Sequence, residues 1–146
     1  MAAFTFRLEQ VRRYRKQLEE QAMQALAQAV MRRDATLERI AALHQAIAEQ
    51  RDRLCRAERL SAAERWLTQN YETALKQDLM QAHTLLAEQE NEVDRCRIEL
   101  VQKAQERNLL DKLRDKQAVR HALQERQHEQ RTNDETATLR YKPAAV

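Results

Sequence analysis

The sequence predicts an all-α protein, an antiparallel two-helix coiled-coil hairpin with an overhanging C-terminal helix. The chain has no glycine, and its single proline is Pro143. These two residue types are the usual interrupters of regular structure. Charged residues make up 34 % and aromatic residues 4 %, which suits the narrow apolar seam of a coiled coil better than a thick core. Apolar residues recur throughout at helical spacing.

The first helix is expected over residues 4–59, with apolar residues in two successive registers. The first register contains Leu8, Val11, Leu18, Ala22, Ala25 and Ala29. The second lies one residue later and contains Met23, Leu26, Val30, Leu37, Ile40, Ile47 and Leu54. Arg33, His44 and Arg51 occupy seam positions in that register. A drift of this kind is expected when a 3.6-residue helix carries a seven-residue repeat.

The turn is expected at residues 60–61, followed by a new helix. Ser61 precedes Glu64 by three residues, the spacing of a capping box in which each side chain accepts a hydrogen bond from the other residue's backbone N–H. The alternative is one uninterrupted helix with Ser61 on its surface.

The second helix is expected over residues 62–138, with a tail at 139–146. Its apolar series is Leu67, Tyr71, Leu75, Leu79, Ala82, Leu86, Val93, Cys96, Leu100, Leu109, Leu110 and Leu113. The series thins to Val119 and Leu123, and residues 124–135 are almost wholly polar. That polar stretch is either a frayed helical end or a face for a partner, and disorder is the competing prediction for the last dozen residues.

Folding the chain back at residue 60 or 61 makes one hairpin domain over residues 1–146. Facing residues then have numbers that add to about 121. The expected neighbours are Ala25 with Cys96, Leu37 with Thr84, Leu8 with Leu113, and Val11 with Leu110. Residues beyond 117 are left without an intramolecular partner.

Net charge and cysteines indicate a soluble cytoplasmic protein. The 26 basic residues nearly balance 23 acidic ones, for a formal charge of +3, so neither nucleic acid nor an anionic membrane is required. The N-terminus has no apolar signal region, and no run approaches the ~20 apolar residues of a membrane span. Cys55 and Cys96 lack CxxC or metal-ligand spacing, so both are expected to remain free thiols.

Enzymatic and metal chemistry are not indicated. His121 and His128 are seven residues apart, and Thr132 replaces the second histidine of an HExxH motif, so we interpret both histidines as solvated. No catalytic triad is evident, and we expect no cofactor, metal or small-molecule substrate. Trp66 is expected to pack over the hairpin tip, or otherwise to be an exposed anchor. The basic run at residues 12–16 is either a partner contact or a solvated surface, at even odds.

Both ends of the chain resemble the FliJ family of flagellar export proteins. The N-terminal match consists of Phe4, Phe6, Leu8, Glu9 and Val11. The C-terminal match consists of Leu123, Glu125, Arg126, Gln130, Asp134, Glu135 and Ala137. The glycine-poor hairpin between them matches almost any coiled coil and adds little specificity.

The resemblance implies a cytoplasmic stalk of the flagellar type III export apparatus, peripheral at the inner face of the cell membrane. Such stalks are similar to the central stalk of rotary ATPases, sit in the hexameric export ATPase and promote its assembly and turnover. They also contact the export-gate membrane protein and export chaperones. The residues expected at the ATPase are Leu8, Val11, Arg12, Arg15, Gln130, Asp134 and Glu135. Those expected at the export gate are Tyr71, Leu75, Leu79 and His83. The alternative is that the three apolar residues of this set simply pack on the first helix.

Three alternatives remain open at this point. The equivalent stalk of an injectisome secretion system would share the fold and differ only in its genomic neighbours. A purely structural, self-associating scaffold would be an obligate dimer without effect on any ATPase. A nucleic-acid binder would show steeply salt-dependent binding to DNA, and the balanced charges argue against it.

Overall fold

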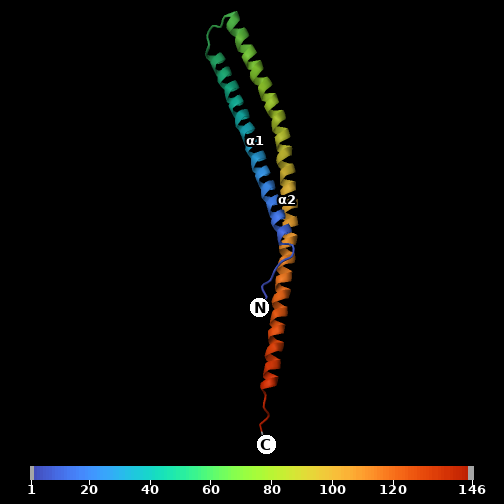
Figure 1. Ribbon diagram of the computed structural model, residues 1–146. Coiled ribbons are helices and arrows are strands. Elements are labelled where there is room, and N and C mark those ends of the chain that lie inside the picture. Colours follow the sequence, from blue (N-terminus) through green and yellow to red (C-terminus); the bar gives the residue numbers. More distant parts are fainter. Residues whose placement is uncertain (1, 145–146) are drawn as a thin grey trace. The chain divides into compact units, whose positions relative to one another are not determined.

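The computed structural model describes residues 2–144, which contain two helices. Helix α1 spans Glu9–Arg56, and helix α2 spans Ala62–Arg140. The helices pack against each other as a hairpin, with no strand among the described residues (Figure 1). The prediction of an all-α helical hairpin is therefore confirmed.

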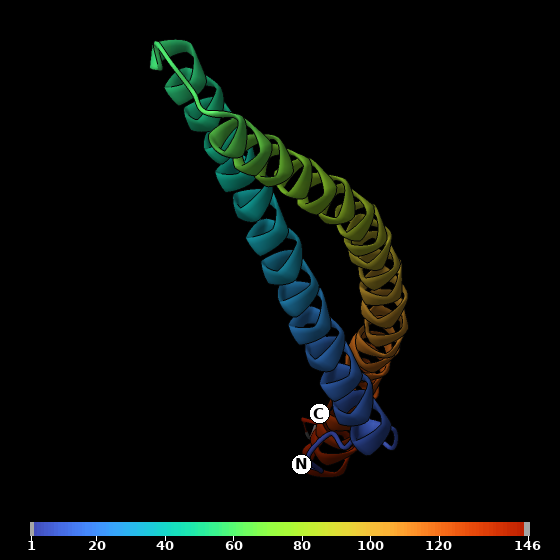
Figure 2. The same ribbon diagram turned by 90° about the horizontal axis from the view of Figure 1, so that it is seen from above.

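The helix ends differ from the predicted boundaries in three places. α1 begins at Glu9 rather than residue 4, and it ends at Arg56 rather than residue 59. Residues 57–61 form a longer connection than the predicted turn at 60–61 (Figure 2). α2 starts as predicted at Ala62 but continues to Arg140, so the predicted tail at 139–146 begins two residues inside the helix. Residues 145–146 of that tail lie outside the described residues.

The chain divides into two compact units, each containing part of both helices. The turn unit is Glu20–Val101, and the terminal unit is Met1–Glu19 together with Gln102–Val146. Each unit is described by itself. That the whole chain forms one domain stays a prediction.

The capping box at the start of α2 is formed as the sequence predicts. The Glu64 N–H donates to Ser61 Oγ at 3.2 Å, and the Ser61 N–H donates to Glu64 Oε2 at 2.9 Å. Two backbone donors at the helix start are thereby satisfied. This reciprocal pair explains why α2 begins at Ala62 and excludes the alternative of an uninterrupted helix.

The turn unit is held by a continuous apolar seam between its two helices. Its buried residues are Ala22, Ala29, Thr36, Ile40 and Ile47 of α1 and Leu75, Ala82, Val93 and Cys96 of α2. Most are spaced by three, four or seven residues, as in the seam of a coiled coil. Val93 is the largest fully buried side chain, at 1 % exposure. It packs with Ala29 and Cys96, and Ala25 lies against this cluster, as expected from the predicted Ala25–Cys96 neighbourhood.

The second predicted register of α1 is wrong at alternate positions. Leu37 is 43 % exposed and His44 is exposed, whereas Thr36 is buried and Leu43 is half-buried. Ile40 and Ile47 belong to both the predicted and the observed seam. Ile40 lies three residues after Leu37 and four after Thr36, and Ile47 lies three residues after His44 and four after Leu43. Leu37 and Thr84, the predicted neighbours, are both exposed, so this pair is not part of the buried seam. Thr36 tolerates burial because its hydroxyl donates to the Arg32 carbonyl at 3.2 Å, which satisfies the polar group locally.

The predicted spacing of facing residues is confirmed by ion pairs between α1 and α2. In the turn unit Arg51 pairs with Glu72 at 3.5 Å, and their numbers add to 123. In the terminal unit Arg15 pairs with Glu106 at 2.6 Å, and these numbers add to 121. Both cysteines are free, with Cys55 exposed and Cys96 buried.

The N-terminal residues of the terminal unit form a strap rather than the predicted first turn of a helix. We define the strap as residues 2–8, of which Phe6 is only 8 % exposed. The Phe4 ring lies 5.6 Å from the His121 ring of α2, measured between centroids. The expectation that residues beyond 117 lack an intramolecular partner is therefore wrong at His121. All residues from 126 to 144 are exposed.

Candidate protein-interaction surfaces

The two helices of the terminal unit are joined by ion pairs at positions where apolar contacts were predicted. Leu8, Val11 and Leu113 are exposed, so these residues do not form a buried apolar seam. Instead, Arg12 Nε donates to Asp111 Oδ1 at 2.7 Å. Arg15 Nη1 donates to Glu106 Oε2 at 2.6 Å. The aliphatic parts of long side chains such as Arg12 and Arg15 can cover a helix interface while their charged groups stay at its edge.

Asp111 is the centre of this ion-pair network. It accepts hydrogen bonds from Arg12 and, at 2.6 Å, from Arg107 Nη1, while Arg107 also pairs with Glu19. Glu9 pairs with the other side of the Arg12 guanidinium at 2.9 Å. The hydrogen bond from Arg12, followed by that from Arg107, holds the pKa of Asp111 below its ordinary value of 3.8. The hydrogen bonds that Arg107 donates to Glu19 and to Asp111 likewise raise the pKa of Arg107.

This network changes the expected role of the basic run at residues 12–16. Arg12 and Arg15 were predicted to stay exposed for a partner, yet both are half-buried and pair with α2. Arg13 and Lys16 are exposed instead, and they remain available to an external partner. The sequence did not distinguish these residues, because a run of basic residues points nearly all round a helix.

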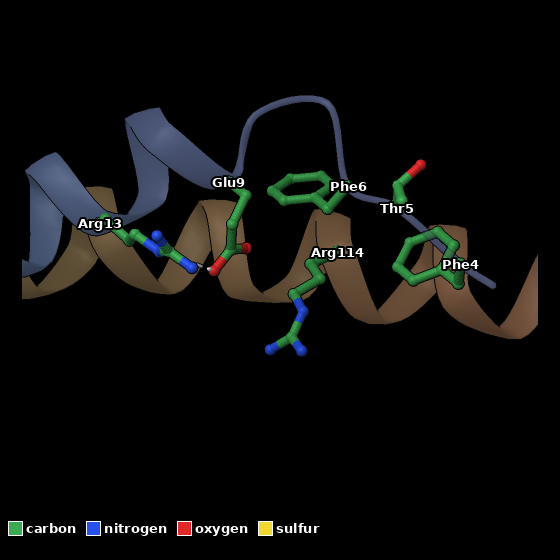
Figure 3. A pocket seen from close by; sticks show the side chains of 6 residues that line it. All are labelled: Phe4, Thr5, Phe6, Glu9, Arg13 and Arg114. Atoms are coloured by element: carbon green, nitrogen blue, oxygen red, sulfur yellow. Dashed lines mark ion pairs between the residues drawn. The ribbon is translucent and has the colours of Figure 1, made fainter.

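The strap and the start of α1 enclose a hollow of about 400 Å³ in the terminal unit. Its walls are Phe4, Thr5, Phe6, Glu9, Arg13 and Arg114. Figure 3 shows both phenylalanine rings against α2, whereas the Arg114 guanidinium points away from them. Arg13 Nε lies 3.6 Å from Glu9 Oε1. The hollow combines aromatic walls with arginine at its rim.

The C-terminal part of α2 presents polar side chains without tertiary contacts. Gln130, Asp134 and Glu135, which were expected at the ATPase, are all exposed. Threonine hydroxyls in this segment bond to carbonyls one turn earlier, for example Thr138 Oγ1 to the Asp134 carbonyl at 2.7 Å. The carboxylates of Asp134 and Glu135 take part in no ion pair within residues 2–144. They are therefore free to accept basic groups of a partner.

The four residues expected at the export gate do not share one exposed surface. Tyr71 is 49 % exposed and His83 is exposed, with its ring 6.2 Å from that of His44. Leu75 is buried and Leu79 is half-buried, because both belong to the apolar seam. Only Tyr71 and His83 are accessible to a partner without unfolding.

An exposed apolar group near the start of α2 extends the accessible surface beyond Tyr71. Trp66 is 62 % exposed, so the prediction that it packs over the hairpin tip is wrong and the alternative of an exposed anchor fits. Leu67 beside it is exposed as well. The sequence placed Leu67 in the seam, because its helical spacing from Tyr71 matched the apolar series.

No candidate metal centre is found among the described residues. Within residues 2–144, no group of three or more His, Cys, Asp or Glu side chains is arranged to hold a metal ion. No helix in the same range has both the length and the apolar character needed to cross a bilayer.

Comparison with known proteins supports the resemblance seen at the two chain ends. The family model described as "Flagellar FliJ protein" matches residues 4–145. Searches of curated proteins and of solved structures found no match. The family match spans the strap, both helices and the exposed polar end of α2.

Proposed function

Because this chain belongs to the FliJ family of flagellar export proteins, we propose that it is a stalk that binds and stimulates a hexameric export ATPase. Its family makes it a component of the flagellar type III export apparatus. The finer proposal is that it acts in the cytoplasm at the inner face of the membrane, where it links the ATPase to the export gate and to export chaperones. The family match over residues 4–145 carries this proposal.

Surface chemistry at the end of α2 supports the ATPase contact. Gln130, Asp134 and Glu135 are exposed on a helix that continues to Arg140. Exposed charges give fast, reversible and specific association rather than permanent burial, which suits a contact that breaks at each step of a rotary cycle. Arg12 and Arg15, although half-buried, lie at the edge of the terminal unit, and the exposed Arg13 and Lys16 add charge beside them.

The test is the ATP hydrolysis rate of the cognate export ATPase with and without this protein. We expect stimulation by the intact chain and none by a chain that ends after Leu123. Residues 126–144 are exposed, and Glu125 adds only a 3.8 Å pair with His121, so circular dichroism of the truncated chain should retain the hairpin signal. Equal stimulation by both chains would exclude the terminal segment as the ATPase contact.

Point variants sharpen this experiment without changing chain length. Asp134→Lys with Glu135→Lys should abolish stimulation, since the reversed charges repel basic groups of the ring. Glu99→Lys is a matched control on the same helix, because Glu99 is exposed and forms no ion pair within residues 2–144. A self-associating scaffold would instead be dimeric in sedimentation experiments and leave the hydrolysis rate unchanged.

The export-gate contact is tested separately with the cytoplasmic part of the gate protein. Tyr71→Ala and His83→Ala should weaken binding and leave thermal stability intact, because both side chains are exposed. Leu75→Asp should unfold the turn unit, since Leu75 is buried. Full gate binding by the Tyr71 and His83 variants would place the gate contact elsewhere.

A further inference from the structure

A groove on the turn unit runs along residues 80–92 of α2, beside the gate residues Leu79 and His83. It consists of two adjoining hollows that share Leu85 and Glu88 of α2. The first is lined by Met80, Gln81, Thr84, Leu85 and Glu88. The second lies between the helices and is lined by Ala29, Arg32, Leu85, Glu88, Gln89 and Glu92. From Met80 to Glu92 the groove follows about 18 Å of helix, which is about the length of three helical turns.

The two ends of the groove differ in chemistry. At one end Met80 is 72 % exposed and Leu85 is also exposed, which leaves apolar area in contact with water. At the other end Glu88 and Glu92 present carboxylates to the second hollow. Ala29 forms part of its floor, and the small side chain leaves room there.

The acidic end keeps one exposed carboxylate, that of Glu88, free for a ligand that donates hydrogen bonds. Gln89 Oε1 is buried and has no hydrogen-bond donor among residues 2–144. Because that oxygen has almost no accessible surface, a ligand in the hollow does not reach it. The Glu88 carboxylate also forms no ion pair within the described chain. Glu92 is partly engaged, because it pairs with Arg95 and accepts a 3.7 Å hydrogen bond from Cys96 Sγ.

From these features we propose that the groove binds an amphipathic helix of a partner protein that carries basic and apolar residues on one face. An arginine or lysine of that helix pairs with Glu88, and an apolar residue one or two turns away covers Met80 and Leu85. We choose a basic partner because the carboxylates of the groove attract basic residues, whereas they repel nucleic-acid phosphates and acidic peptides. Arg32 on the opposite wall donates only to the Gln28 carbonyl, at 3.4 Å, and its charge opposes the incoming cation.

Glu88 and Arg32 carry opposite charges, so substitutions at the two positions should change peptide affinity in opposite directions. A purely structural role of these residues would not produce that result. The probes are two synthetic 16-residue helical peptides, one with leucine and arginine on one face and one with each arginine replaced by glutamate. Each is titrated into the isotope-labelled full chain, and backbone amide shifts are followed by NMR. We expect the basic peptide to shift amides of residues 80–92 and of Arg32, and the acidic peptide to cause no saturable shift.

Variants of the groove should move the affinity in opposite directions. Glu88→Lys should weaken the basic peptide about tenfold, and Arg32→Ala should tighten it about twofold. Leu85→Ser should weaken it by removing apolar contact, while Glu99→Lys should bind like the unmodified chain. Circular dichroism checks that each variant is folded. We expect folding to be retained because the substituted positions are exposed. Equal affinities of the Glu88→Lys and Glu99→Lys variants, shifts outside the groove, or equal binding of the acidic peptide would each overturn the proposal.

Discussion

The turn unit and the terminal unit contain the same two helices but are held together by different forces. In the turn unit, nine buried side chains form an almost entirely apolar seam, with Thr36 as the one polar member. In the terminal unit, Arg12, Arg107 and Asp111 form an ion-pair network at the helix interface, and Phe6 of the strap is the buried apolar residue. The comparison shows that one coiled-coil hairpin can place a stable apolar segment and an ionic, condition-sensitive segment on the same pair of helices.

The largest effect is expected from placing a charge in the apolar seam. Val93→Asp should lower the free energy of unfolding by about 3 kcal/mol or more, because the carboxylate would be buried beside Ala29 and Cys96 without a partner. Urea denaturation followed by circular dichroism measures this loss. Leu37→Asp is the matched control: Leu37 is exposed, so its loss should stay within about 0.5 kcal/mol. Equal losses would mean that the predicted register, with Leu37 in the seam, is the correct one.

Removal of the buried ring of the strap should give the next largest effect. Phe6→Ala removes a ring that is only 8 % exposed, and we expect a local loss of about 2 kcal/mol. The strap should then detach from α2, which NMR detects as a change in the His121 ring signals because Phe4 leaves its position 5.6 Å away. Thr5→Ala, at an exposed position, should leave those signals in place. Unchanged His121 signals in the Phe6 variant would show that Phe4 holds the strap by itself.

The ion-pair network should make the terminal unit sensitive to acid and salt. The pKa of Asp111 is lowered in the folded state, so its carboxylate stabilises the unit above the ordinary pKa. That stability is lost as the pH falls through the lower folded value. The protection of terminal-unit amides against hydrogen exchange, relative to their intrinsic rates, should therefore fall below about pH 4, and 1 M salt should weaken the network by screening.

Substitution of Asp111 isolates its contribution to this pH dependence. Asp111→Asn should destabilise the terminal unit by about 1–2 kcal/mol at neutral pH and flatten its response to acid. Asp115→Asn is the control, because Asp115 is exposed and forms no ion pair within residues 2–144. If both variants keep the pH dependence of the unmodified chain, another carboxylate is responsible.

The smallest effect is expected at the helix cap that both sequence and structure identify. Ser61→Ala removes the acceptor for the Glu64 N–H, and we expect a loss of about 0.5–1 kcal/mol with fraying of the first turn of α2. Ser61→Asn retains a capping oxygen and should restore most of that stability. Thermal denaturation of the two variants measures the difference. Identical melting temperatures would indicate that packing alone determines where α2 begins.

The sequence by itself determined the fold class, the turn and the approximate pairing of the helices. A chain without glycine and with regular apolar spacing has few structures available other than long helices, and a capping box is a local interaction that needs no distant residue. The exposed polar end at Gln130, Asp134 and Glu135 was also predictable, because no apolar residue draws it into a seam.

Only the tertiary structure decided which neighbouring positions face the partner helix. Thr36 and Leu37 differ by one step on α1, and helical periodicity permits either in the seam, so the choice depends on packing against α2. Arg12 and Arg15 face α2 because Asp111 and Glu106 lie opposite them, a match between residues that are far apart in the sequence. The strap also depends on residues that are far apart in the sequence. Phe6 is buried when the strap lies on α2, whereas a free helical turn at the N-terminus would leave it exposed to water.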